Sequence, residues 1–163
     1  MNIKKLVSAI KKADADRILI SRLEDNKLFI ISEHFAVIIP EYEIKEKLIE
    51  LGLMDFNGMI KNECNNTLCK DLLSRDGNEA SITDLYYKDF RLFTVKNKIV
   101  AYDKKYLELF KDYKNYEIVD SDYPPNLKIL DDDYKYVGII LPVRINNGGL
   151  AKLIERLQGK EIF

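Results

Sequence analysis

The sequence predicts an α+β fold made of two similar halves, and three observations support this prediction. A helix-like segment at residues 3–11 aligns without a gap with residues 103–111. Three strand-like runs follow each segment, and the third run of each half ends in a similar stretch of apolar residues closed by proline, at residues 35–40 and 137–142. A unit of one helix and three strands buries its apolar face only against its counterpart. We therefore expect the halves to share one core, with their helices side by side.

The first half begins with an amphipathic helix over residues 3–12, in which apolar side chains recur at helical spacing. Alternating apolar residues then predict three short strands at residues 17–23, 27–32 and 35–39, the last closed by Pro40. The turns between these strands are only a few residues long, so the strands should pair antiparallel.

Residues 41–90 have no counterpart in the other half, and we interpret them as an enlarged, partly helical connector. The spacing predicts a helix over residues 43–51 that ends at Gly52. A shorter helix is expected over residues 67–74 and a strand at residues 82–87.

The second half repeats the order of the first. A hairpin at residues 91–95 and 98–102 leads into a helix over residues 104–113, for which Asp103 is the expected cap. Three more strands are expected at residues 116–120, 127–130 and 136–145.

These elements define one domain at residues 1–145, with halves at about 1–40 and 91–145, followed by a linker and a C-terminal helix at residues 146–163. The apolar residues at the C-terminal end could form an exposed docking tail or fold back on the domain. No apolar run approaches the roughly 20 residues that cross a bilayer, and no signal peptide is evident. We therefore expect a cytoplasmic protein with no membrane partner.

Two stretches of the second half, YDKKYL at residues 102–107 and YVGIILPVRI at residues 136–145, resemble the last part of a bacterial sliding clamp. This clamp is the processivity factor of the replicative DNA polymerase. The resemblance implies a DNA-clamp-like domain of two helix-plus-antiparallel-strand repeats, with the helices facing DNA. Because a clamp chain carries two or three such domains and this chain has room for one, the resemblance is to a divergent, single-domain member.

The resemblance also implies a noncatalytic role in DNA replication or repair. The implied partners are double-stranded DNA, a DNA polymerase or other replication protein, and further copies of the chain in a homo-oligomer. The alternative is a protein-interaction or regulatory module, of phage origin, that keeps the clamp fold without a ring or DNA binding.

Eight lysines on the two predicted helices are the candidates for DNA contact. The net charge is −1, so the chain as a whole is not basic, but these helices could form a local basic face. Lysines suit nonspecific contact with phosphates. In the alternative interpretation they only solvate the helix surfaces, and Glu108 and Asp112 dilute their charge. The eight candidates are Lys4, Lys5, Lys11, Lys12, Lys104, Lys105, Lys111 and Lys114.

A partner could instead bind in a groove on the strand face. The candidates for this groove belong to the last predicted strand and its ending: Val137, Ile139, Leu141, Pro142, Val143 and Arg144.

The sequence offers little support for an enzyme. His34 is the only histidine and falls at a predicted turn, without a marked nucleophile. The run of three aspartates at residues 131–133 is expected to be a solvated turn. Cys64 and Cys69 lack a second ligand pair for zinc. We therefore expect no catalytic residue, no metal and no cofactor.

Overall fold

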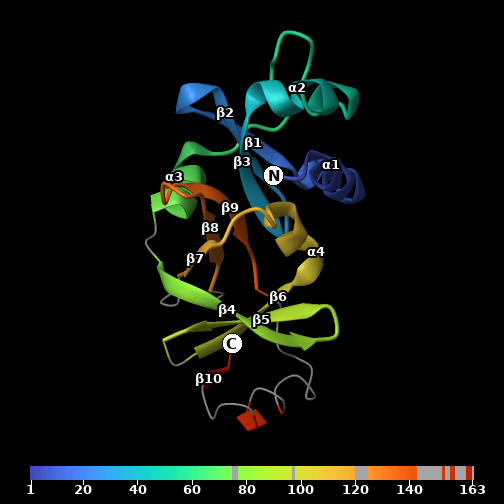
Figure 1. Cartoon of the computed structure of the whole chain (residues 1–163). Helices are drawn as coiled ribbons and strands as arrows, with labels where there is room; N and C mark the ends of the chain where they lie inside the picture. The colour runs from blue at the N-terminus through green and yellow to red at the C-terminus, as the bar shows by residue number, and fades with distance from the viewer. Residues whose placement is uncertain are drawn as a thin grey trace.

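The computed structural model describes residues 1–74, 77–96, 98–119 and 125–142, together with Lys152, Glu155, Arg156, Glu161 and Ile162. Within these residues the chain is α+β, with four α-helices and one large, mostly antiparallel sheet (Figure 1). The predicted α+β class is confirmed. The predicted linker and most of the C-terminal helix, with Val143 and Arg144, lie outside the described residues.

The first half has the predicted elements in the predicted order. Helix α1 (Ile3–Lys12) is capped by Asn2, whose Oδ1 accepts a hydrogen bond of 3.1 Å from the Lys5 amide. The 3-10 turn η1 (Ala15–Arg17) precedes three antiparallel strands. These strands are β1 (Leu19–Leu23), β2 (Lys27–Ile31) and β3 (Phe35–Pro40), with the 3-10 turn η2 (Glu24–Asn26) between the first two.

The connector contains both predicted helices, α2 (Glu41–Glu50) and α3 (Asn66–Ser74). Its strand, β4 (Asn78–Tyr87), begins earlier than the pattern indicated, because its first residues pair with a strand of the second half. Tertiary pairing thus extends the strand beyond its alternating apolar segment.

The second half begins with the predicted hairpin of β5 (Phe90–Val95) and β6 (Lys98–Asp103). The helix predicted over residues 104–113 is shorter: α4 (Lys104–Leu107) continues as the 3-10 turn η3 (Glu108–Phe110). Residues 112–115 are Asp, Tyr, Lys and Asn, mostly weak helix formers, so little favours a further turn. The remaining strands are β7 (Asn115–Ile118), β8 (Leu127–Leu130), β9 (Tyr136–Ile140) and β10 (Glu161–Ile162).

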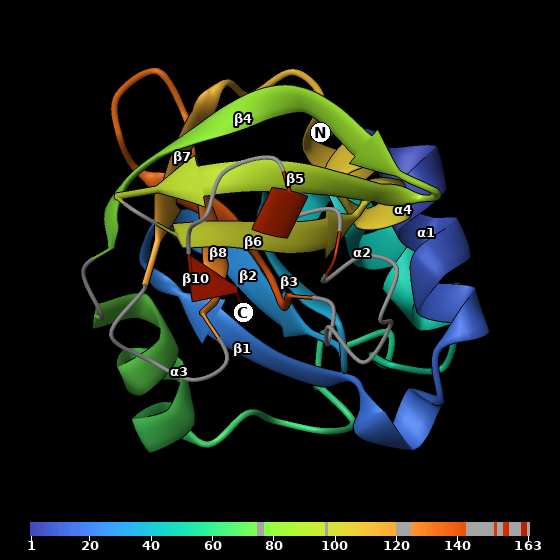
Figure 2. The same ribbon diagram turned by 90° about the horizontal axis from the view of Figure 1, so that it is seen from below.

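The strand order in the sheet is β1-β2-β3-β9-β8-β7-β4-β5-β6-β10. Two antiparallel meanders, β1–β3 and β7–β9, therefore meet through their third strands, with Val37 opposite Gly138. Strand β4 pairs with β7 and with β5, so it connects the second meander to the β5–β6 hairpin. In Figure 2 this hairpin lies nearer to the viewer than β1–β3. Ile162 pairs in parallel with Ile99 of β6, so this part of the C-terminal segment folds back on the domain.

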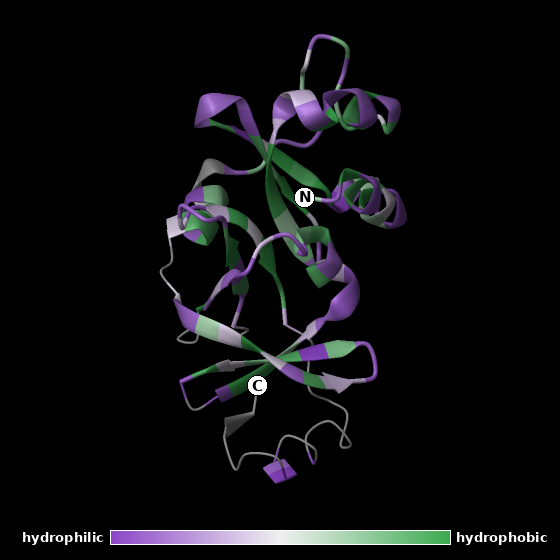
Figure 3. Ribbon diagram, in the orientation of Figure 1, coloured by the Kyte–Doolittle hydropathy of each residue, from purple (hydrophilic) through white to green (hydrophobic). Residues whose placement is uncertain are grey.

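The helices cover the sheet from two sides. Helices α1, α2 and α4 lie together on one side, and α3 lies on the other (Figures 1 and 2). The alternation of the strands follows this division: Leu28 and Ile30 belong to the main core, whereas Phe29 packs on the α3 side. Figure 3 shows the apolar residues concentrated in the strands, with polar residues on the outer helix turns.

Tyr102 of β6 is fully buried, and its hydroxyl donates a hydrogen bond of 2.8 Å to the backbone carbonyl of Pro125. Burial raises the pKa of Tyr102 well above its usual value, and burial also raises the pKa values of Tyr113 and Tyr116. The folded state therefore holds these phenols neutral at a pH where the unfolded chain ionises them.

This difference predicts alkaline destabilisation. The contribution of Tyr102 to stability is complete below about pH 10, the value for an unperturbed tyrosine, and is lost as the pH rises through the folded-state pKa. Urea unfolding measured at increasing pH should show the free energy of unfolding falling above this value. Tyr102→Phe should cost about 1 kcal/mol at neutral pH through the lost hydrogen bond, and should make the alkaline fall shallower. An equally steep fall in the variant would contradict the assignment to Tyr102.

Candidate nucleic-acid interface

Helix α1 and the α4–η3 segment lie side by side, which is the arrangement expected if the two halves pack together. The backbone amide of Asn2 donates a hydrogen bond of 3.3 Å to the Leu109 carbonyl. Lys5 donates a hydrogen bond and forms an ion pair with Glu108 across the two segments. The N-terminal amine lies 3.8 Å from the Asp112 carboxylate. Buried side chains of both segments hold them on the sheet, namely Leu6, Val7 and Ile10 of α1 with Leu109 and Phe110 of η3.

All eight candidate lysines are exposed on these two segments or directly after them. We call the surface formed by residues 1–12 and 104–114 the basic face. It carries eight lysines against two carboxylates, whereas the rest of the chain has 18 Lys and Arg against 25 Asp and Glu. The positive charge of a slightly acidic protein is thus concentrated on one pair of helical segments.

Two of the eight lysines have a carboxylate within ion-pair distance. Lys5 pairs with Glu108, and the Nζ of Lys105 lies 3.8 Å from an oxygen of Asp103. The Lys5 ammonium holds the pKa of Glu108 below its usual value, and the charges of Lys104 and Lys111 act in the same direction. The other six lysines form no ion pair with any residue that the structure describes: Lys4, Lys11, Lys12, Lys104, Lys111 and Lys114.

The four groove candidates that the structure describes, Val137, Ile139, Leu141 and Pro142, do not all lie on an open surface. Ile139 is only 5% exposed and packs with Phe29 and Cys69 beneath α3. Val137, Leu141 and Pro142 are half-buried. Ile139 therefore cannot contact a partner while α3 stays in place. The sequence predicts α3 as a helix but gives no sign of which side of the sheet it covers.

The aspartate run at residues 131–133 and the two cysteines belong to a turn and to the core. Asp131 caps the β8–β9 turn, because its Oδ1 accepts hydrogen bonds from the amides of Asp133 (2.9 Å) and Lys135 (3.0 Å). Cys64 and Cys69 are free, buried thiols, and burial raises the pKa of Cys64 to about 12.

Among the described residues no group of histidine, cysteine and acidic side chains is arranged to hold a metal ion. None of the described helices has the length and apolar character needed to span a bilayer.

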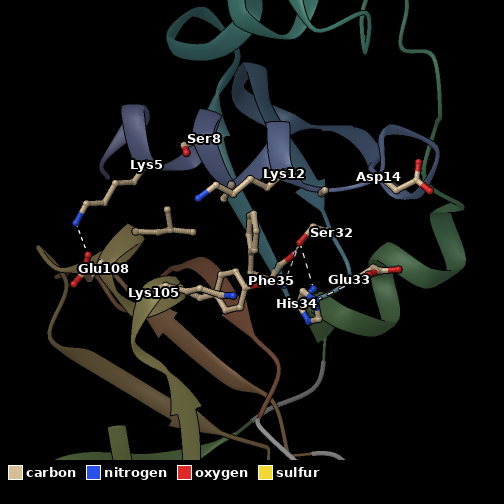
Figure 4. Close-up of a pocket in the computed structure, with 14 residues that line it drawn as sticks. Lys5, Ser8, Lys12, Asp14, Ser32, Glu33, His34, Phe35, Lys105 and Glu108 are labelled. Carbon is tan, nitrogen blue, oxygen red and sulfur yellow. Dashed lines mark hydrogen bonds and ion pairs between the residues drawn. The ribbon is translucent and has the colours of Figure 1, made fainter. Parts of the chain in front are cut away.

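Sequence reasoning missed one feature of the basic face, a pocket of about 430 Å³ between α1, α4–η3 and the β2–β3 turn (Figure 4). His34 lies on its wall, stacked on Tyr106 with 5.5 Å between ring centroids. The residues that form the pocket come from three separate segments, so no local motif marks it.

Comparison of the chain with protein-family models, with curated proteins and with solved structures gave no match.

Proposed function

We propose that this chain is a noncatalytic, sliding-clamp-like module that holds double-stranded DNA through the basic face during replication or repair. The observation that supports the proposal is the concentration of eight lysines on two adjacent helical segments, six of them without an ion pair in the described part of the chain. The resemblance of residues 102–107 and 136–145 to a bacterial sliding clamp points in the same direction.

The chemistry of the basic face suits the DNA backbone rather than the bases. Lysine ammoniums are flexible point charges that neutralise phosphates and release counterions, which gives binding that depends on salt and not on sequence. The helix backbones are fixed by their buried apolar side chains, so the lysines start from a rigid support. A module of this kind would hold DNA without chemical change, and a polymerase-type partner would use its remaining surface.

The test is charge reversal at two exposed lysines near Glu108, Lys104→Glu with Lys111→Glu. The matched control reverses Lys47 and Lys70, which are exposed on α2 and α3. We expect the first variant to lose about tenfold or more in affinity for a blunt duplex, and its slope of log affinity against log salt to become shallower by about 0.9 per lost phosphate contact. The control should bind like the original chain. Equal affinities in the two double variants would refute DNA contact through the basic face.

A gain-of-function variant sharpens the same test. Glu108→Gln keeps the side-chain shape but removes one of the two carboxylates of the basic face and releases Lys5 from its ion pair. Duplex affinity should therefore rise, with a salt slope steeper by up to about 0.9. Weaker or unchanged binding would show that the charge of this surface does not face DNA.

A second candidate function, a protein-interaction module, is favoured by one exposed apolar site. Phe56 and Met59 are 88% and 70% exposed at the tip of the loop that follows α2. The loop is rigidly folded: Asp55 Oδ1 accepts hydrogen bonds from the Asn57 and Met59 amides, at 2.9 Å and 2.8 Å. A fixed loop that exposes two large apolar side chains is typical of a contact for another protein. The mass of the chain in solution separates the functions, because a ring-sized assembly supports the clamp and a monomer supports the module.

A further inference from the structure

The pocket on the basic face has the size of a small-molecule site. Its volume of about 430 Å³ falls within the roughly 300–1,000 Å³ of typical ligand pockets. Helix α1 forms one wall, the α4–η3 segment forms the second, and the β2–β3 turn closes the third (Figure 4). The pocket can therefore hold a group of about the size of one nucleotide, but not a duplex.

One side of the pocket is aromatic. The His34 ring stacks on Tyr106 with 21° between the ring planes, and Tyr106 in turn lies 5.4 Å from the Phe35 ring. Phe35 is buried, whereas 61% of the His34 side chain is exposed. His34 is thus supported by the Tyr106 ring, which itself rests on the buried Phe35, and it offers exposed ring surface to the pocket. Planar ligands such as nucleobases stack on aromatic side chains of this kind.

The carboxylates at the pocket already have partners. Glu108 is paired with Lys5, and Glu33 is paired with Arg17. Asp14 caps η1 through its side chain and lies 4.0 Å from the Arg17 guanidinium. Because Glu33 and Asp14 share the Arg17 guanidinium, the pocket lining carries three lysines against three carboxylates, and its formal charge is balanced.

Two lysines of the pocket lining remain accessible to an anion. Lys12 on the α1 wall forms no ion pair with a described residue. Lys105 lies at the rim, with its Nζ 4.9 Å from the centroid of the Tyr106 ring and 3.8 Å from an oxygen of Asp103, an exposed and therefore weak ion pair. Ser8 adds a hydroxyl on the same wall as Lys12. Two ammoniums and a hydroxyl around an aromatic surface suit a ligand that joins a planar ring to an anionic group.

We propose that this pocket binds a single nucleotide, with the base against His34 and the phosphate between Lys12 and Lys105. The nucleotide can come from two sources, a free mononucleotide or an unpaired nucleotide of a DNA strand. The site goes beyond the proposed function, which requires only phosphate contacts along the outer lysines and no recognition of a base.

The test is calorimetric titration of the full chain with thymidine monophosphate, thymidine and inorganic phosphate. The monophosphate should bind more tightly than either of the others, because each of them makes only part of the contacts. Lys12→Gln and His34→Ala should each weaken monophosphate binding about tenfold. The matched control, Lys47→Gln, changes an exposed lysine of α2 that lies outside both the pocket and the basic face and should alter affinity less than about twofold.

Competition identifies the source of the nucleotide. A duplex with a single-stranded overhang that displaces the monophosphate better than a blunt duplex indicates a DNA strand, and equal competition by the two duplexes indicates a free nucleotide. The absence of monophosphate binding at about 10 mM, or an equal loss in Lys47→Gln, overturns the proposal. The two proposals are tested by different variants. Blunt-duplex binding is measured with the Lys104→Glu and Lys111→Glu double variant, and neither of these lysines lines the pocket. Loss of one activity therefore leaves the other proposal intact.

Discussion

Gly138→Ala is expected to destabilise the protein by roughly 3 kcal/mol, near the upper end of the range for an overpacked core. A Cβ at position 138 would lie 2.2 Å from two ring carbons of Phe110 and 3.1 Å from the Ala36 carbonyl oxygen. Real contacts of this kind are never so short, so either the Phe110 ring or strand β9 has to move. Because Phe110 holds η3 on the sheet, the substitution also displaces part of the basic face.

The measurement is the free energy of urea unfolding for Gly138→Ala, Phe110→Leu and the double variant. Removing the ring relieves the collision, so the double variant should be at least about 1 kcal/mol more stable than the sum of the single losses predicts. Gly52→Ala is the matched control. Its φ of +73° strains an alanine, but nothing lies within 4 Å of the added Cβ, so its loss of about 1 kcal/mol reports the backbone alone. Strict additivity in the double variant would show that the Phe110 ring does not rest on Gly138.

Phe93→Ala is expected to cost about 3–5 kcal/mol, the usual loss for a phenylalanine removed from a core. Phe93 of β5 is completely buried. Its ring makes edge contacts with Tyr102, at 5.4 Å between centroids, and with Tyr116, at 5.1 Å. Such aromatic pairs add about 0.5–1.5 kcal/mol each beyond their buried area. Phe93 therefore joins the β5–β6 hairpin to β7 of the second meander.

Unfolding in urea again provides the measurement, and Phe56→Ala is the matched control. Phe56 is 88% exposed, so the same substitution there should change stability by no more than about 0.5 kcal/mol. If Phe93→Ala does not fold, Phe93→Leu should fold with a smaller loss, because it keeps most of the buried volume. Losses of similar size at positions 93 and 56 would contradict the shared core of the hairpin and the meander.

Much of the local structure was predictable, because apolar side chains repeat with the period of the element that buries them. Alternating apolar residues indicated the strands of the first half, and Asp103 caps α4 through its side chain as the sequence predicted. The packing of the Phe110 ring on Gly138 was not predictable, since that contact joins η3 to a strand distant in the sequence.

The candidate site divides in the same way. The eight lysines and their place on two helical segments, or directly after them, follow from the sequence, because exposed residues of an amphipathic helix are polar whatever the helix packs against. The chain order could not reveal that α3 lies over Ile139, nor that His34 stacks on Tyr106 beside Lys12. Those contacts join residues far apart in the chain, and their free energy depends on the three-dimensional packing of whole elements. The sequence by itself determined the elements and the charges they carry, and the tertiary structure alone decided which of them meet.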